Sequence, residues 1–329
     1  MVNEENRKRV RLYALGGAGI NVGSSFVKYE KKGSEGFAKI ETVFVDTSKS
    51  NISSSIPVEN IYLVDNLDGS GKIRASNYEA LLECSKEILH KHRPGDVNVV
   101  LHSTGGGTGS TIGPIIVSEL LARGENVIVI MTGSTSSRIE TENTLKTLKS
   151  YEVISNKRQI PVIAAYRENT QDKPRGMVDS EVQTLIVFIA AIFSGQNREL
   201  DMSDLRNFLQ YNKVTSYAPK LSLFEVFTRN IILTKGQTLV SLATLIDEKS
   251  SSDVDVHPEY QAVGFISQNT KEAMTVDVPI HACVISGYFN GIADRLNQRL
   301  VAFDEVRKVV VEKSIVHRDD QSTDDGLVL

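Results

Sequence analysis

Two hydrophobic patterns alternate along the first half of the chain. Short runs rich in Val, Ile and Leu predict buried strands at residues 10–15, 40–45, 97–101, 127–131 and 161–165. Segments with apolar residues three or four apart predict the intervening helices, at residues 20–29, 78–91, 112–123 and 140–156. This alternation is typical of an α/β fold with a doubly wound, mainly parallel sheet, which binds its ligand beyond the carboxyl ends of the strands.

The pattern changes after residue 178. Residues 179–193 predict a helix that is apolar nearly all round, as expected of an element packed between two layers. The segments after it predict a short helix at 203–211, strands at 222–227, 239–246, 262–266 and 282–286, and a long helix with apolar residues three or four apart from Phe289 to Val310. We therefore expect a central helix that is followed by a smaller, mixed α/β second domain.

The composition argues against several classes of protein. Hydrophobic residues make up 40% and charged residues 24% of the 329 positions, which is ordinary for a globular chain. The longest apolar run, residues 185–193, is about half of a membrane span, so no membrane partner is expected. The two cysteines have no metal-ligand spacing and fit a reducing cytosol. Residues 319–329 contain four aspartates and no basic residue; the net charge is −4, so the rest balances near zero and no direct nucleic-acid binding is expected.

Two glycine-rich loops follow predicted strands. Residues 14–23 (ALGGAGINVG) open a helix, where backbone N–H groups and the helix N-terminus can bind a phosphate. This loop nearly matches the GxGxxG dinucleotide fingerprint, and Asp46 closes the next strand, so an NAD-dependent oxidoreductase is one interpretation. Residues 103–114 (STGGGTGSTIGP) form the second loop. Two phosphate cradles suit a nucleoside triphosphate better than a dinucleotide.

Neither loop is a Walker A motif, because no lysine follows GGGTGST. The charge of a terminal phosphate would therefore be met by backbone dipoles, by the hydroxyls of Thr108 and Ser110 and by Mg²⁺. This separates the chain from the common P-loop NTPases.

The motifs GGAGIN and GGGTGST resemble the two nucleotide loops of the tubulin and FtsZ superfamily, whose signature is GGGTG followed by a small residue. The resemblance covers the whole chain in order, and the acidic, apolar-tipped ending DDGLVL is similar to that of the tubulins of large bacteriophages. It implies a tubulin/FtsZ-like GTPase fold with a GTP-binding domain at 1–178, a central helix at 179–195, an activation domain at 196–312 and an acidic C-terminal tail at 313–329.

The resemblance also implies which residues contact the nucleotide, GTP or GDP with Mg²⁺. An amide and a carboxylate can pair with the edge of guanine, which favours GTP over ATP. Residues 134–140 would run beside the ribose, and no protein side chain is assigned as a metal ligand. The implied contacts are Gly16, Gly17, Ala18, Gly19 and Asn21 in the first loop, Asp46 and Thr47 in the second, Gly69 and Gly71 in the third, Gly105, Gly106, Gly107, Thr108, Gly109 and Ser110 in the signature loop, and Asn169 and Asp179 at the base.

The segment LDMSDL, residues 200–205, places Asp201 and Asp204 on one face of a predicted helix start. On the residues alone, helix capping is the simpler explanation for both acids. The resemblance to the family's LDFADV loop implies a catalytic role instead: the two acids would position a water near the terminal phosphate held by the next subunit. Hydrolysis would then require a head-to-tail contact, which propagates into an open filament.

The resemblance finally implies a setting and partners. The protein would form dynamic, GTP-dependent filaments that position phage DNA or its compartment in the cytoplasm of the infected bacterium, and its tail would bind a neighbouring subunit. Three departures from the family pattern, Ala18, the pair Ser110 and Thr111, and Glu199, leave open a filament protein that binds GTP without hydrolysing it. His102, next to the signature loop, is interpreted as a satisfied buried histidine.

Overall fold

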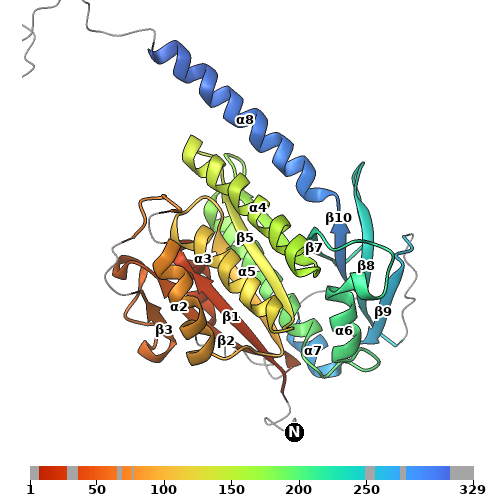
Figure 1. The fold of residues 1–329 in the computed structure, drawn as a ribbon. Coiled ribbons are helices and arrows are strands. Elements are labelled where there is room, and N and C mark those ends of the chain that lie inside the picture. The colour runs from red at the N-terminus through yellow and green to blue at the C-terminus, as the bar shows by residue number, and fades with distance from the viewer. Residues whose placement is uncertain are drawn as a thin grey trace, which may run out of the picture.

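A computed structural model describes residues 7–27, 36–64, 69–75, 78–248, 256–274 and 279–311. These residues form one ten-stranded sheet with the order β3-β2-β1-β4-β5-β6-β7-β10-β8-β9 (Figure 1). The strands are β1 (Arg9–Leu15), β2 (Lys39–Asp46), β3 (Ile61–Leu63), β4 (Val97–Ser103), β5 (Val127–Ser134), β6 (Val162–Asn169), β7 (Leu221–Phe227), β8 (Thr238–Ile246), β9 (Tyr260–Phe265) and β10 (Ile280–Ser286). The acidic tail predicted at 313–329 lies outside the described residues.

The sheet is mainly parallel, as the sequence predicted. Along the sheet from β3 through β2, β1, β4, β5 and β6 to β7, each strand is parallel to the next, whereas β10 is antiparallel to both β7 and β8. Strands β4 and β5 are buried on both faces over almost their whole length, which explains why they read as unbroken apolar runs. The first six strands have the 3-2-1-4-5-6 order of doubly wound nucleotide-binding folds.

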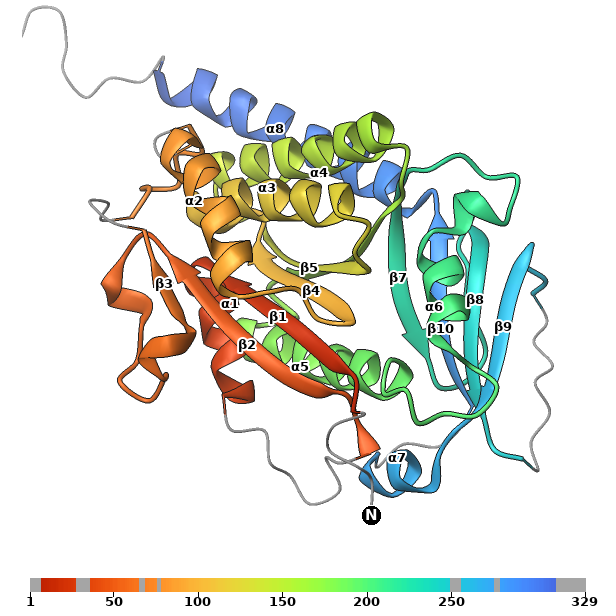
Figure 2. The same ribbon diagram turned by 60° about the horizontal axis from the view of Figure 1, so that its bottom comes forward.

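Helices cover both faces of this sheet. Figure 2 shows α2, α3, α4 and α8 on one face and α1 and α5 on the other. Each helix layer packs against the sheet in a hydrophobic core of its own. Leu81, Ile116 and Leu148 belong to the core on the side of α2, α3 and α4, and Val22 and Val182 belong to the core on the side of α1 and α5. None of the described helices is long and apolar enough to cross a bilayer. The helices are α1 (Gly16–Gly23), α2 (Tyr78–Lys91), α3 (Thr108–Ala122), α4 (Arg138–Arg158), α5 (Arg175–Ile192), α6 (Met202–Leu209), α7 (Gln268–Ala273) and α8 (Tyr288–Val311).

The second half of the chain continues the same sheet. Three residues at the start of β6 pair in parallel with three at the start of β7, with Val162 opposite Leu221. An ion pair between Arg167 and Glu225 and another between Arg295 and Glu168 tie the strands and α8 together across this junction. The mixed α/β region is therefore bonded to the nucleotide-binding part through the sheet as well as through α5.

The apolar stripe predicted along α8 is buried only in the first part of the helix. Phe289, Ile292 and Leu296 are buried and Leu300 packs partly buried against the same core, whereas Val306, further along the stripe, is 63% exposed. Figure 1 shows the C-terminal end of α8 projecting past α4. The spacing identified the helix correctly, yet it could not tell a core stripe from a stripe without a partner in the same subunit.

Candidate functional site

The two glycine loops meet where the strand order reverses, because β1 and β4 are neighbours in the sheet and each loop follows one of them. Gly16 has φ +68°, and a Cβ there would lie 3.1 Å from the Gly109 nitrogen. A Cβ on Gly109 would lie 2.9 Å from the Leu15 carbonyl oxygen. Only glycine permits this contact of backbone against backbone. The two loops therefore form one continuous floor at the carboxyl ends of the strands.

One side of this floor is open. A Cβ on Gly106 would meet no atom within 4 Å, in contrast to its neighbours in the signature loop. The helices α1 and α3 begin at Gly16 and Thr108, so the unpaired N–H groups of two helix N-termini belong to the same floor. Such convergent N–H groups and helix dipoles attract an anion, and a phosphate above all.

Three hydroxyl groups from separate segments converge at the edge of the floor. The Thr47 and Thr108 oxygens lie 2.8 Å apart, and the Ser70 oxygen lies 3.5 Å from that of Thr108. Hydroxyl oxygens are ligands that Mg²⁺ accepts. The described residues contain no group of three His, Cys, Asp or Glu side chains that could hold a metal ion.

Asp46 acts as a buried support. Its carboxylate accepts hydrogen bonds of 2.7 Å from the Thr47 N–H and from the Asn51 side chain. Burial raises the pKa of Asp46, while these hydrogen bonds act in the opposite direction. Asn51 in turn lies against Gly17, 3.0 Å from where a Cβ would be. Asp46 thus holds the segment after β2 against the first glycine loop.

The hydroxyls that follow the signature loop face its own backbone. Ser110, fully buried, donates to the carbonyl oxygens of Gly106 and Gly107. Thr111 also donates to Gly107, at 2.8 Å. These bonds hold the signature loop in place, and a contact of the Ser110 hydroxyl with a phosphate stays a prediction.

The residues expected at the base lie on three elements, and two of them are in contact. Asn21 of α1 donates a hydrogen bond of 2.8 Å to Asp179 of α5. Burial raises the pKa of Asp179, and Arg175, 3.6 Å away, acts against this rise. At the end of β6, the side-chain oxygen of Asn169 is buried and has no hydrogen-bond partner among the described residues. A buried amide oxygen without a partner fits a ligand that donates to it.

Asp201 and Asp204 lie far from these loops in the same subunit. They form a capping box at the start of α6: Asp201 accepts from the N–H groups of Ser203 and Asp204, and Asp204 accepts from the Asp201 N–H. Helix α5 has 18 residues and is about 27 Å long; Asp179 lies near its N-terminal end, and Ala190, whose carbonyl accepts from the Ala38 N–H, lies near its C-terminal end. The two acids therefore lie at the opposite end of the molecule (Figure 1).

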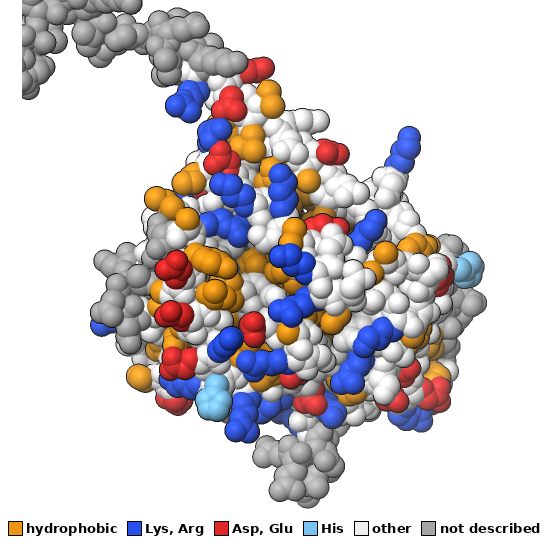
Figure 3. Space-filling model, viewed as in Figure 1, with side chains coloured by type: hydrophobic (Ala, Val, Ile, Leu, Met, Phe, Trp, Pro, Cys, Tyr) orange, Lys and Arg blue, Asp and Glu red, His pale blue; other side chains and the backbone are white. Residues whose placement is uncertain are grey.

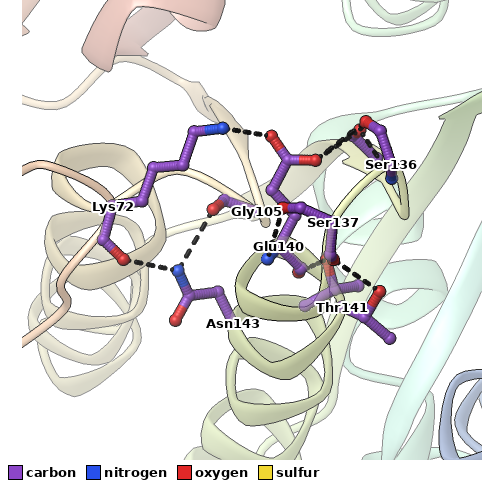
Figure 4. A network of polar contacts seen from close by, with 9 residues as sticks. Lys72, Gly105, Ser136, Ser137, Glu140, Thr141 and Asn143 are labelled. Carbon is purple, nitrogen blue, oxygen red and sulfur yellow. Dashed lines mark hydrogen bonds and ion pairs between the residues drawn. The ribbon is translucent and has the colours of Figure 1, made fainter. Parts of the chain in front are cut away.

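A charged network borders the signature loop, and sequence reasoning missed most of it. In Figure 4, the Glu140 carboxylate accepts hydrogen bonds of 2.6 Å from Lys72 and of 2.9 Å each from Ser134 and Ser136. Burial would raise the pKa of Glu140, but these three bonds outweigh it and lower the pKa. Glu140 is thus an anion at neutral pH.

Asn143 links the same network to the backbone. Its amide donates to the carbonyl oxygens of Lys72, at 2.8 Å, and of Gly105, at 3.1 Å (Figure 4). Arg74 extends the contact to α4 by donating to Thr147 at 2.7 Å. The sequence signalled none of this, because the loop at 69–75 reaches α4 only through the tertiary fold.

This chain is similar to known proteins in both sequence and fold. Residues 9–159 match the family model described as "Tubulin/FtsZ family, GTPase domain". A phage tubulin-like protein of Pseudomonas phage phiKZ is 25% identical over 337 residues, covering 98% of this chain and 99% of that protein. The protofilament structure of TubZ from bacteriophage PhiKZ has a TM-score of 0.81 at 27% identity and covers 97% of this chain and 99% of that one. The phage tubulin PhuZ, solved with GDP, has the same fold, with a TM-score of 0.84 at 22% identity and coverage of 97% and 99%.

Proposed function

We propose that the protein belongs to the tubulin/FtsZ family, whose GTPase-domain model matches residues 9–159, and that it binds and hydrolyses GTP and assembles head to tail into filaments. The observation that carries the proposal is the shared floor of the two glycine loops, open at Gly106. The phage tubulin-like relatives suggest the cytoplasm of an infected bacterium as its place of action and phage DNA or its compartment as its cargo. The matches do not support the NAD-dependent oxidoreductase that the first loop alone allowed.

The floor suits the phosphates of GTP. The N-termini of α1 and α3 supply N–H groups and dipoles, and the hydroxyls of Thr47, Ser70 and Thr108 would serve a Mg²⁺ ion that neutralises phosphate charge. Asn21, Asp179 and Asn169 would read the base, and the buried side-chain oxygen of Asn169 has no hydrogen-bond donor among the described residues. Guanine offers N1–H and N2–H donors for the oxygens of such side chains.

Hydrolysis needs a group that positions water, and the position of α6 suggests how it is supplied. The capping box engages Oδ1 of Asp201 and Oδ2 of Asp204, and the Tyr260 hydroxyl donates to Oδ1 of Asp204 at 3.4 Å. Each carboxylate still has lone pairs to which a water can donate. Because α5 separates these acids from the floor, they would act on the nucleotide of the next subunit in the row. There they would orient a water and accept its proton, which is worth about 10²- to 10⁴-fold for placed acid–base groups.

A groove between α2, α3 and α4 is a candidate receptor for the acidic tail of a neighbouring subunit. Its volume is about 910 Å³. On the face seen in Figure 3, Lys and Arg side chains are interspersed with hydrophobic ones, which complements aspartates followed by Leu-Val-Leu. The charged and apolar residues that line the groove are the basic Lys72, Arg74 and Lys146, the acidic Glu79 and Glu142, and the apolar Ile73, Ala75, Tyr78, Ala80, Pro114, Ile115 and Ile139.

The proposal is tested by measuring phosphate release from GTP and light scattering together as protein concentration rises. Release should begin only where scattering begins, and Asp204→Asn, which keeps an oxygen for the cap, should assemble while releasing phosphate at least about tenfold more slowly. Asp294→Asn, at an exposed position on α8, is the matched control. Release proportional to concentration at every dilution would contradict catalysis across the interface. Thermal protection by NAD and none by GTP would overturn the proposal itself.

A further inference from the structure

The phosphate floor has a charge problem. Neither glycine loop, at 14–23 or 103–114, contains a basic residue, whereas a nucleoside triphosphate carries several negative charges. Glu140 adds another negative charge beside the floor, because a Cβ on Gly105 would lie 3.1 Å from the Glu140 Cβ. An anion of low pKa next to a phosphate site opposes phosphate binding unless a cation offsets it.

Lys72 is a cation that the fold places against this floor. Its Cα lies 3.2 Å from the position of a Cβ on Gly107, and its ammonium group lies 2.6 Å from Glu140. The ion pair therefore spans the signature loop, with one end against Gly107 and the other against Gly105. The Lys72 side chain is 51% exposed, so its ammonium group is open to a ligand.

The backbone at Lys72 is held in an uncommon conformation. Lys72 has φ +65°, directly after Gly71 with φ +53°. A lysine in the left-handed region costs about 1 kcal/mol or more, and such strain persists only where surrounding contacts maintain it. Those contacts are the hydrogen bond from Asn143 to the Lys72 carbonyl and the turn closed by the Ile73 N–H on the Ser70 carbonyl, at 2.8 Å each. These contacts hold Lys72 in its strained conformation, and this conformation places its side chain at the signature loop.

We propose that Lys72 is a phosphate-binding residue whose ammonium group turns from Glu140 to the terminal phosphate of the bound nucleotide. The inference rests on the proposed function and deepens it. A lysine ammonium is a compact charge on a flexible stem with three donors, which suits exchange between two anionic partners. Glu140 is the competing partner: it holds the ammonium near the floor when no terminal phosphate is bound and keeps two further donors, Ser134 and Ser136, afterwards.

The test measures equilibrium binding of a non-hydrolysable GTP analogue, GDP and GMP to full-length protein below its assembly concentration. Lys72→Met should weaken binding of the triphosphate about ten- to hundredfold, as expected for loss of a charge-assisted hydrogen bond, with a smaller effect on GDP and none on GMP. Lys72→Arg should retain most of the affinity, because it keeps the charge. Glu140→Gln should bind the triphosphate more tightly than the wild type, since the competing anion is removed.

Lys149→Met, at an exposed position on the outer side of α4, controls for the loss of a lysine. Two results would overturn the inference: triphosphate affinity of Lys72→Met equal to that of the wild type, or equal losses for triphosphate, GDP and GMP, which would indicate a structural role. If Lys72→Met without ligand unfolds at a lower temperature than the wild type, Glu140→Gln becomes the deciding variant. Unchanged or weaker triphosphate binding by Glu140→Gln would then contradict the proposed move of the ammonium group from Glu140 to the phosphate. A wild type that binds no guanine nucleotide would refute the proposed function as well.

Discussion

His102 is expected to make the fold sensitive to mild acid. It lies in β4 directly before the signature loop and is fully buried, with Nε2 2.6 Å from the Tyr151 hydroxyl and Nδ1 3.1 Å from the Ser103 carbonyl oxygen. A neutral ring satisfies both partners: Nδ1–H donates to the carbonyl and Nε2 accepts from the phenol. Burial lowers the pKa of His102 from 6.5 to about 4, with the nearby Arg74 guanidinium acting in the same direction.

The size of the effect follows from this pKa difference. Between pH 6.5 and about 4, the unfolded chain takes up a proton at this position that the folded chain does not, so stability falls as the pH falls. One pKa unit corresponds to about 1.4 kcal/mol, which makes the loss about 3 kcal/mol over the whole interval. A loss of this size is a large fraction of the stability of a typical domain.

Urea unfolding of the wild type and of His102→Gln at pH 7.5 and pH 4.5 measures this contribution. The variant should be less stable at pH 7.5, because it loses the fitted ring beneath Gly113, and the gap to the wild type should narrow by about 2 to 3 kcal/mol at pH 4.5. His90→Gln, at an exposed position at the end of α2, controls for the loss of a histidine. A gap of the same size at both pH values would refute the reasoning.

Two further predictions concern the glycine loops and the tail. Gly109→Ala should destabilise the fold by about 1 to 3 kcal/mol, because its Cβ would press on the Leu15 carbonyl, whereas Gly106→Ala should leave stability unchanged and weaken GTP binding. Unfolding measured with and without GTP distinguishes the two effects, and equal destabilisation by both variants would contradict the geometry. Deletion of residues 319–329 should weaken assembly while GTP binding is retained, because the aspartates and the apolar tip would bind a neighbouring subunit; filaments that sediment in unchanged yield would count against it.

Local patterns were sufficient for most of the sheet and for the position of the floor. Strands β4 and β5 are buried on both faces, so their apolar runs stand out, and a glycine loop after a strand marks a ligand site in any doubly wound sheet. The three-residue strand β3 and the short helix α7 were not predicted, because elements of that length carry too little pattern.

The polar surroundings of the floor could not be predicted in the same way. Lys72 reaches Glu140 across 68 positions of sequence, and although the resemblance implied a third loop at Gly69 and Gly71 and a ribose segment at 134–140, it did not pair these two residues. Asp201 and Asp204 illustrate a different limit, since the spacing that suits a capping box also suits two acids aimed at a neighbour. Here the structure shows the cap, and the catalytic role remains a prediction that only assembly can test.

Because α5 separates the floor from α6, the number of complete catalytic sites in a row of subunits would differ from the number of subunits. If each complete catalytic site needs the floor of one subunit and the acids of the next, a row of n subunits contains n − 1 sites, and the last floor always lacks its acids. A lone subunit then has no turnover, a pair has one site for two nucleotides, and only long rows approach one site per subunit. On this arrangement the subunit at one end of each row would keep its triphosphate for as long as it is the end, and the nucleotide of every other subunit would record how long that subunit has been in the row.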